Sequence, residues 1–144
     1  KEYHKQFSSR IERWMDEGHG SCLLANPSNA DMVANTLERC DGSRYLLHSW
    51  AIMPNHVHVL VSPNEEQSLS RIVAAWKRFS GTRIHKAEET SGSLWQKDYF
   101  DRLIRDWDHF INVARYIRRN PVRAGLSVGG FLAYEAPWVA KLLS

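Results

Sequence analysis

The chain has 144 residues, of which 43% are hydrophobic and 24% are charged. This length suits one domain with a hydrophobic core, and the composition excludes disordered and fibrous proteins. The sequence contains neither an apolar run long enough to span a bilayer nor a secretory signal. We therefore expect a cytoplasmic protein, in which Cys22 and Cys40 remain reduced and mostly buried.

The net charge of +3 is unevenly distributed along the chain. Residues 1–66 carry 6 Lys and Arg against 9 Asp and Glu, whereas residues 67–124 carry 12 against 6. A basic segment of this kind favours a polyanionic partner such as nucleic acid. The imbalance is a weak indication by itself, because many solvated helices are locally basic.

The first half of the chain is expected to form two helices and a β-hairpin. The helical spacing of Ile11, Trp14 and Met15 predicts a helix over Arg10–Glu17, ended by two glycines. A second helix is expected over Ser28–Cys40. The apolar runs 45–53 and 56–62 predict two strands, with Pro54-Asn55 between them.

The second half is expected to form a long helix, a strand and two further helices. Apolar residues at helical spacing predict a helix from Ser68 to about Glu89. Residues 99–105 are interpreted as a strand, after which Asp106 caps a helix over Trp107–Asn120. Pro121 should end that helix, and residues 138–143 form a short one. Strands and helices in this order, without βαβ alternation, predict a single α+β domain over 1–144 with an antiparallel sheet.

His56 and His58 stand two residues apart in the second predicted strand. Side chains at this spacing point to the same face of a strand, so the two imidazoles should lie side by side. Neutral imidazoles in this arrangement can bind a divalent metal ion. Two polar residues on the solvent face of an edge strand would give the same pattern.

Tyr116 and Asn120 lie four residues apart on the predicted helix after Asp106, and so share one of its faces. His109 and Asn112 precede them on that face. An adjoining apolar stripe (Phe110, Val113, Ala114 and Ile117) should anchor the helix on the sheet. A tyrosine hydroxyl is protonated at neutral pH and is then a poor nucleophile. A nearby divalent ion could orient and polarise a phosphate for it to attack.

Three segments together resemble the HUH single-tyrosine transposases, in particular the REP-associated tyrosine transposases of bacteria. They are MPNHVHVLV (53–61), FDRLIRD (100–106) and YIRRNPVRAGL (116–126). The resemblance implies a ferredoxin-like fold and cleavage and rejoining of DNA through a 5′-phosphotyrosine. It implies Tyr116 as nucleophile and His56, His58 and Asn120 as ligands of Mg²⁺ or Mn²⁺. Residues 1–9 form a poor strand, so we expect the family's first strand to be missing or replaced.

The resemblance also implies single-stranded or hairpin DNA from palindromic repeats as substrate, and a nucleoid-associated protein that is a monomer or a homodimer. Eight basic residues are expected to contact DNA phosphates: Arg71, Lys77, Arg78 and Arg83 on the long helix, and Arg115, Arg118, Arg119 and Arg123 around Tyr116. The last four should repel one another unless a polyanion or acidic side chains neutralise them. Because only Asp106 and Asp108 lie close in sequence, we expect DNA to be the partner. Four tryptophans could stack on bases but more naturally fill the core: Trp50, Trp76, Trp95 and Trp107.

Three alternative functions share parts of this pattern. An HUH replication or mobilisation nickase uses the same chemistry, usually within a larger chain. A DNA-binding protein of the same fold would bind without cutting. A metal-dependent hydrolase would need an acidic ligand near the histidines, for which Asp98 or Asp101 is available.

Overall fold

The structure is a computed structural model, and it describes residues 9–15, 22–64, 66–96 and 100–144. Its elements in chain order are β1 (Arg10–Met15), the 3₁₀ helix η1 (Leu23–Ala25), α2 (Pro27–Glu38), β2 (Tyr45–Met53), β3 (His56–Pro63), α3 (Leu69–Glu88), β4 (Phe100–Leu103), α4 (Trp107–Arg123), β5 (Leu132–Glu135) and α5 (Pro137–Leu142).

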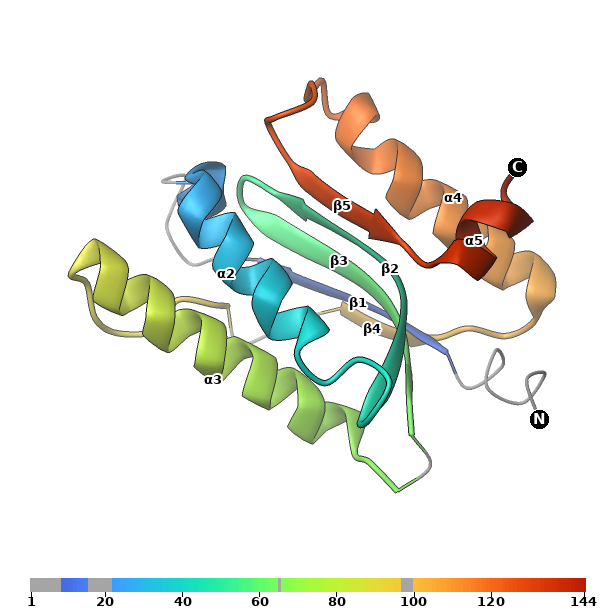
Figure 1. Ribbon diagram of the computed structural model, residues 1–144, viewed down its shortest axis with the longest axis horizontal. Helices are drawn as coiled ribbons and strands as arrows, with labels where there is room; N and C mark the ends of the chain where they lie inside the picture. Colours follow the sequence, from blue (N-terminus) through green and yellow to red (C-terminus); the bar gives the residue numbers. More distant parts are fainter. Residues whose placement is uncertain (1–8, 16–21, 65, 97–99) are drawn as a thin grey trace.

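The five strands form one antiparallel sheet in the order β4-β1-β3-β2-β5. Helices α2 and α3 lie on one side of this sheet, and α4 and α5 lie on the other (Figure 1). The portion from β1 to β4 has the β-α-β-β-α-β succession of a ferredoxin-like fold. The prediction of an α+β domain with an antiparallel sheet is therefore confirmed.

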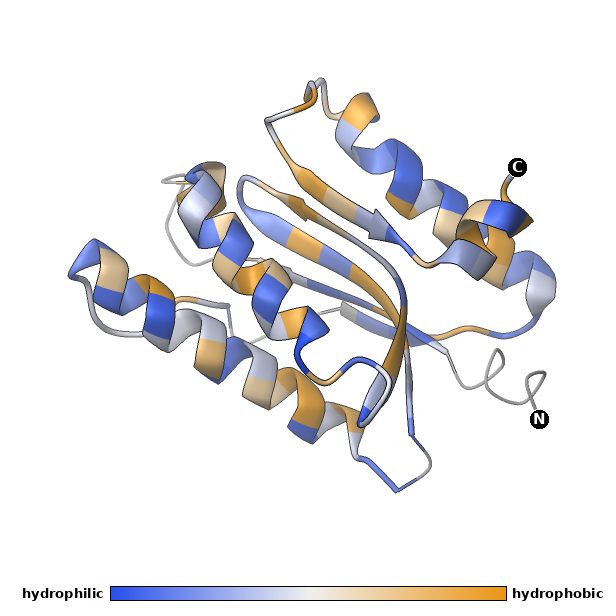
Figure 2. Ribbon diagram, viewed as in Figure 1, coloured by the Kyte–Doolittle hydropathy of each residue, from blue (hydrophilic) through white to orange (hydrophobic). Residues whose placement is uncertain are grey.

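Each face of the sheet has its own hydrophobic core. The core under α2 and α3 is built around large rings, including Trp14, Trp76 and Trp95. The core under α4 and α5 contains smaller side chains, such as Ala51, Ala114 and Ala136. Hydrophobic residues run along β2 and β3, the strands that are covered on both sides (Figure 2). The tryptophans expected to fill the core do so: Trp50, Trp76 and Trp95 are buried, and Trp107 packs partly buried against Phe110.

The predicted helix over Arg10–Glu17 is wrong, because residues 10–15 form strand β1. This strand pairs with β3 on one edge and β4 on the other, and it contributes Trp14 to one core and Ile11 to the other. Its buried residues therefore lack the alternation of a half-exposed strand, and their spacing also fits a helix. A strand thus precedes the first α-helix of the described chain, in a segment that we had assigned to a helix.

The prediction that Pro121 ends the helix after Asp106 is also wrong, because α4 continues to Arg123. Proline removes one backbone hydrogen bond in the last turn, and its ring is buried. The helix is ended by Gly125, whose φ of 80° lies in the left-handed region. The amides of Gly125 and Leu126 donate to the carbonyls of Val122 and Pro121, which is a Schellman motif. Asn120 consequently stays helical, one turn after Tyr116.

The remaining predicted elements are confirmed within a few residues at each end. Ser68 caps α3 and Asp106 caps α4, each by accepting a backbone N–H on its side-chain oxygen. Strand β5 was not predicted. Cys22 and Cys40 are free thiols, as expected, although both are only half-buried. In the described part of the chain, no helix is both long and apolar enough to cross a membrane.

Candidate active site at the histidine pair

The side chains of β3 alternate between the two cores. Val57, Val59 and Val61 enter the core under α2 and α3, so His56 and His58 face the side covered by α4. Their ring centroids lie 4.9 Å apart. The predicted geometry of two neighbouring imidazoles on one strand face is thus confirmed, while their role as metal ligands stays a prediction.

His58 is held in its neutral form. Burial, and to a lesser extent the neighbouring His56 and Arg13, lower the pKa of His58 to about 3. The ring is only 3% exposed, and its buried Nδ1 has no hydrogen-bond partner among the described residues. A buried neutral imidazole with an unsatisfied nitrogen fits the requirements of a metal ligand.

His56 is oriented by the residue before it. Its Nδ1 lies 2.8 Å from Oδ1 of Asn55, and because an amide oxygen only accepts, Nδ1 carries the proton. The lone pair of the neutral ring is then on Nε2. Such a second hydrogen bond fixes the tautomer of metal-binding histidines in many proteins.

Tyr116 reaches the same place from α4. Its ring meets the ring of His58 edge-on, with centroids 5.5 Å apart. Phe110, Ala114 and Ile117 are buried along the inner face of α4 and anchor it on the sheet, as predicted. Tyr116 lies beside this stripe and remains 41% exposed, so a large substrate can reach it.

His58 and Tyr116 line a pocket of about 220 Å³ whose walls come from β1, β3, β4 and α4. Its lining is Ile11, Arg13, His58, Arg102, His109, Val113 and Tyr116. Arg13 and Arg102 were not expected here, because β1 was interpreted as a helix. His109 had been noticed only for sharing a helical face with Tyr116. Burial and the nearby Arg105 lower the pKa of His109, which favours its neutral form.

The arginines on α4 are exposed, but one of them has an acidic partner. Arg118 makes two hydrogen bonds of 2.7 and 2.6 Å to the carboxylate of Glu135 on β5. An acidic side chain that is distant in sequence therefore neutralises Arg118. The missed partner lies on the unpredicted strand β5.

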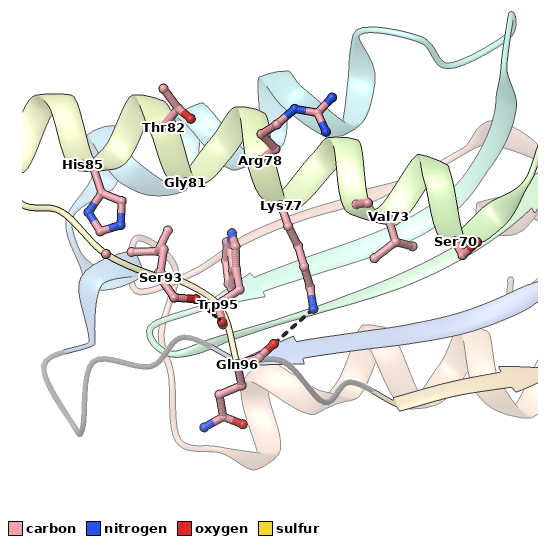
Figure 3. A pocket seen from close by; sticks show the side chains of 13 residues that line it. Ser70, Val73, Lys77, Arg78, Gly81, Thr82, His85, Ser93, Trp95 and Gln96 are labelled. Atoms are coloured by element: carbon pink, nitrogen blue, oxygen red, sulfur yellow. Dashed lines mark hydrogen bonds between the residues drawn. The ribbon is translucent and has the colours of Figure 1, made fainter.

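The basic residues of α3 lie on the opposite face of the sheet from Tyr116. Lys77 and Arg78 line a larger cavity of about 500 Å³ between α3 and residues 92–96, where Lys77 Nζ donates to the carbonyl of Gln96 (Figure 3). Arg71 and Arg83 are exposed on the same helix. The eight basic residues expected to bind DNA thus form two separate groups, and only the α4 group adjoins Tyr116.

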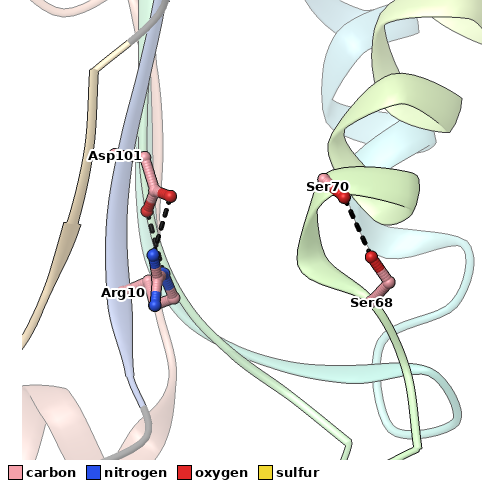
Figure 4. A network of polar contacts seen from close by, with 4 residues as sticks. All are labelled: Arg10, Ser68, Ser70 and Asp101. Carbon is pink, nitrogen blue, oxygen red and sulfur yellow. Dashed lines mark hydrogen bonds and ion pairs between the residues drawn. The ribbon is translucent and has the colours of Figure 1, made fainter.

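Asp101, one of the two acidic residues that a metal-dependent hydrolase could use, does not lie beside the histidines. Asp101 on β4 binds the guanidinium of Arg10 through both oxygens (Figure 4). Asp101 and Arg10 flank Glu12, which shares their face of the sheet, turned away from His58. Asp98 lies outside the described residues. Among those described, no group of three or more His, Cys, Asp and Glu side chains could hold a metal ion.

Comparison with known proteins places the chain in a family. The sequence model of the family described as "Transposase IS200 like" matches residues 24–120. A REP-associated tyrosine transposase solved bound to a REP hairpin superposes with a TM-score of 0.68 at 18% identity, covering 85% of this chain and 71% of that one. A proposed transposase from Deinococcus radiodurans R1 has a TM-score of 0.54 at 18% identity, with coverage of 77% and 88%.

None of the curated protein sequences compared with the chain matches it. The two structural relatives show a shared fold, and the family match spans β2, β3, α3 and α4 up to Asn120. That span contains both histidines and the tyrosine. The chain belongs to the IS200-like transposase family.

Proposed function

We propose that this transposase cuts and rejoins single-stranded DNA through a covalent bond to Tyr116. The observation that carries the proposal is the contact between the rings of Tyr116 and His58, 5.5 Å apart, beside the second imidazole of His56. Three side chains from one strand and one helix thus lie next to one another, and Tyr116 is open to solvent. The family match supports DNA as the substrate.

We further propose that His56, His58 and the amide oxygen of Asn120 hold Mg²⁺ or Mn²⁺. The neutral His58 with its unsatisfied Nδ1, and the Asn55 bond that leaves a lone pair on His56, support this ligand set. No acidic cluster competes for the ion among the described residues. When bound, a divalent ion would polarise the phosphate oxygens and neutralise the charge that develops on them.

The reaction is a transesterification in which the number of phosphoester bonds does not change. The hydroxyl oxygen of Tyr116 attacks the scissile phosphorus, and the bond from phosphorus to the 3′ oxygen breaks. The tyrosine loses its proton and the departing 3′ oxygen gains one. The product is a 5′-phosphotyrosine and a free 3′-OH, and attack by a second 3′-OH reverses these steps and releases Tyr116.

Hairpin-forming DNA is the proposed substrate class. One structural relative was solved bound to a REP hairpin, and its fold matches 85% of this chain. The arginines of α4 near Tyr116 would contact the backbone of such a strand.

Incubation with end-labelled single-stranded hairpin DNA and Mn²⁺ tests the proposal. We expect a protein–DNA band that survives denaturing electrophoresis, and we expect EDTA to prevent it. Tyr116→Phe removes only the hydroxyl, so the band should disappear while DNA affinity remains. A band of wild-type intensity from the Phe variant would exclude Tyr116 as nucleophile, and binding without any band would favour a non-cleaving protein.

The ligand set is tested by a measurement that does not use activity. Titration of the DNA-free protein with Mn²⁺, followed by electron paramagnetic resonance of the free ion, gives the affinity directly. His58→Ala and Asn120→Ala should each weaken binding, by roughly tenfold or more for the histidine. His85→Ala is the matched control on the other face of the sheet and should leave the affinity unchanged.

A further inference from the structure

We infer that Arg13, Arg102 and His109 form a phosphate subsite beside Tyr116, which holds a backbone phosphate next to the one that is cut. This inference rests on the proposed function and names the side chains that hold the strand in place. None of the three is among the residues expected from the sequence to bind DNA.

The sheet brings the two arginines together on the face of Tyr116. Arg102 on β4 is the register partner of Ile11 on β1, and Arg13 follows Ile11 by two residues on the same strand. These side chains therefore share the face that α4 covers. His109 approaches from the first turns of α4, and all three line the pocket that contains Tyr116 and His58.

The hydrogen bond of His109 determines what its ring can do. Its Nδ1 accepts the backbone N–H of Arg105 at 3.0 Å. A nitrogen that accepts a hydrogen bond carries no proton, so the proton of the ring is on Nε2. In this arrangement His109 can donate a hydrogen bond but cannot accept the proton of Tyr116. Its role is therefore to bind an anion and not to act as a general base.

The charge of the pocket matches a phosphodiester. Two guanidinium groups and one N–H donor line it. Guanidinium groups bind phosphate oxygens through paired hydrogen bonds. The same pocket contains the proposed nucleophile. The phosphate that it would bind therefore belongs to the strand being cut and lies one nucleotide away from the scissile phosphate.

Binding of a fluorescent mixed-sequence single-stranded oligonucleotide in EDTA, at several salt concentrations, tests the subsite without cleavage. Arg102→Gln removes one charged contact and should lower the slope of log affinity against log salt by about 0.7. His109→Ala removes a neutral donor, so affinity should fall roughly threefold to tenfold while the slope stays unchanged. His109→Gln keeps an N–H donor and should recover part of the loss. Lys86→Ala, exposed near the end of α3, is the charge-matched control and should bind like the wild type.

The outcomes separate this inference from the proposed function. Arg102→Gln could keep the wild-type salt slope, and His109→Ala could keep the wild-type affinity. In that case these side chains serve the protein's own structure, and the proposal of a phosphate subsite is wrong. That result leaves the proposed function intact if the wild type still forms its covalent adduct. If the variants weaken binding as expected but the wild type forms no adduct, the subsite stands and the cleavage proposal fails.

Discussion

The two faces of the sheet differ in the size of the side chains that they bury. Under α3, Trp14 stacks on Trp76 with ring centroids 5.6 Å apart and meets Trp95 edge-on at 5.2 Å. Under α4 the central residues include Ala51 and Ala114, both fully buried. Helix α4 contacts β2 and β3, and its Tyr116 meets His58 there. We therefore expect the α3 face to supply most of the stability, whereas the proposed chemistry lies on the α4 face.

Removing Trp14 should have the largest effect on stability. Trp14 is fully buried between two other indole rings, so Trp14→Ala should lower the free energy of unfolding by about 3–5 kcal/mol. Val113→Ala, at a partly buried position on the α4 side, should cost about 1 kcal/mol or less. Urea unfolding of both variants measures the difference. Equal losses would show that the two cores contribute alike.

Glu12 makes the α3 face sensitive to pH. Its side chain is fully buried, and neither oxygen has a hydrogen-bond partner of normal geometry among the described residues. Burial, and then the neighbouring Asp101 carboxylate, raise the pKa of Glu12 from 4.5 to about 9. The folded protein therefore keeps a proton that the unfolded chain releases, and stability should fall as the pH rises from about 4.5 to about 9.

Glu12→Gln should remove this dependence. At pH 8 the variant should be more stable than the wild type by about 1–3 kcal/mol, and the difference should shrink toward pH 4.5. Glu38→Gln, at an exposed position on α2, serves as the control and should follow the wild-type profile. Thermal unfolding across this pH range measures both. A Glu12→Gln variant that is less stable at every pH would contradict the assignment of a protonated carboxyl.

Trp138 should show the smallest effect of the three. Its indole Nε1 donates to Nδ1 of His48 at 2.9 Å and ties α5 to β2, while the side chain remains 41% exposed. Trp138→Phe removes one hydrogen bond and should cost about 1 kcal/mol in urea unfolding. Lys141→Ala on the same helix should cost nothing measurable. If the two variants behave alike, this hydrogen bond does not stabilise the α4 face.

Strong local patterns made part of the fold predictable. The apolar runs of β2 and β3, the periodicity of α3 and the capping Asp106 each indicated the observed element. Strand β1 was misjudged because its buried residues belong to both cores and so do not alternate with exposed ones. Strand β5 has only four residues and an irregular burial pattern, so its pairing with β2 could not be seen in its sequence.

The site was predictable only where its residues lie close in sequence. The spacing of His56 and His58 predicted their shared face, and the tyrosine helix was recognised from its motif. Arg13 and Arg102 could not be placed, because their position depends on the pairing of β1 with β4 across almost ninety intervening residues. The partner of Arg118 was missed for the same reason, since Glu135 belongs to β5.

Mapping the covalent adduct tests the central claim most directly. Wild-type protein that has reacted with hairpin DNA and Mn²⁺ is digested with nuclease and protease, and the remaining nucleotide is located by tandem mass spectrometry. We predict a nucleotide joined through its 5′ phosphate to Tyr116, together with a released strand that ends in a 3′-OH. A nucleotide on any other residue, or cleaved DNA with a free 5′ phosphate and unmodified protein, would contradict the account.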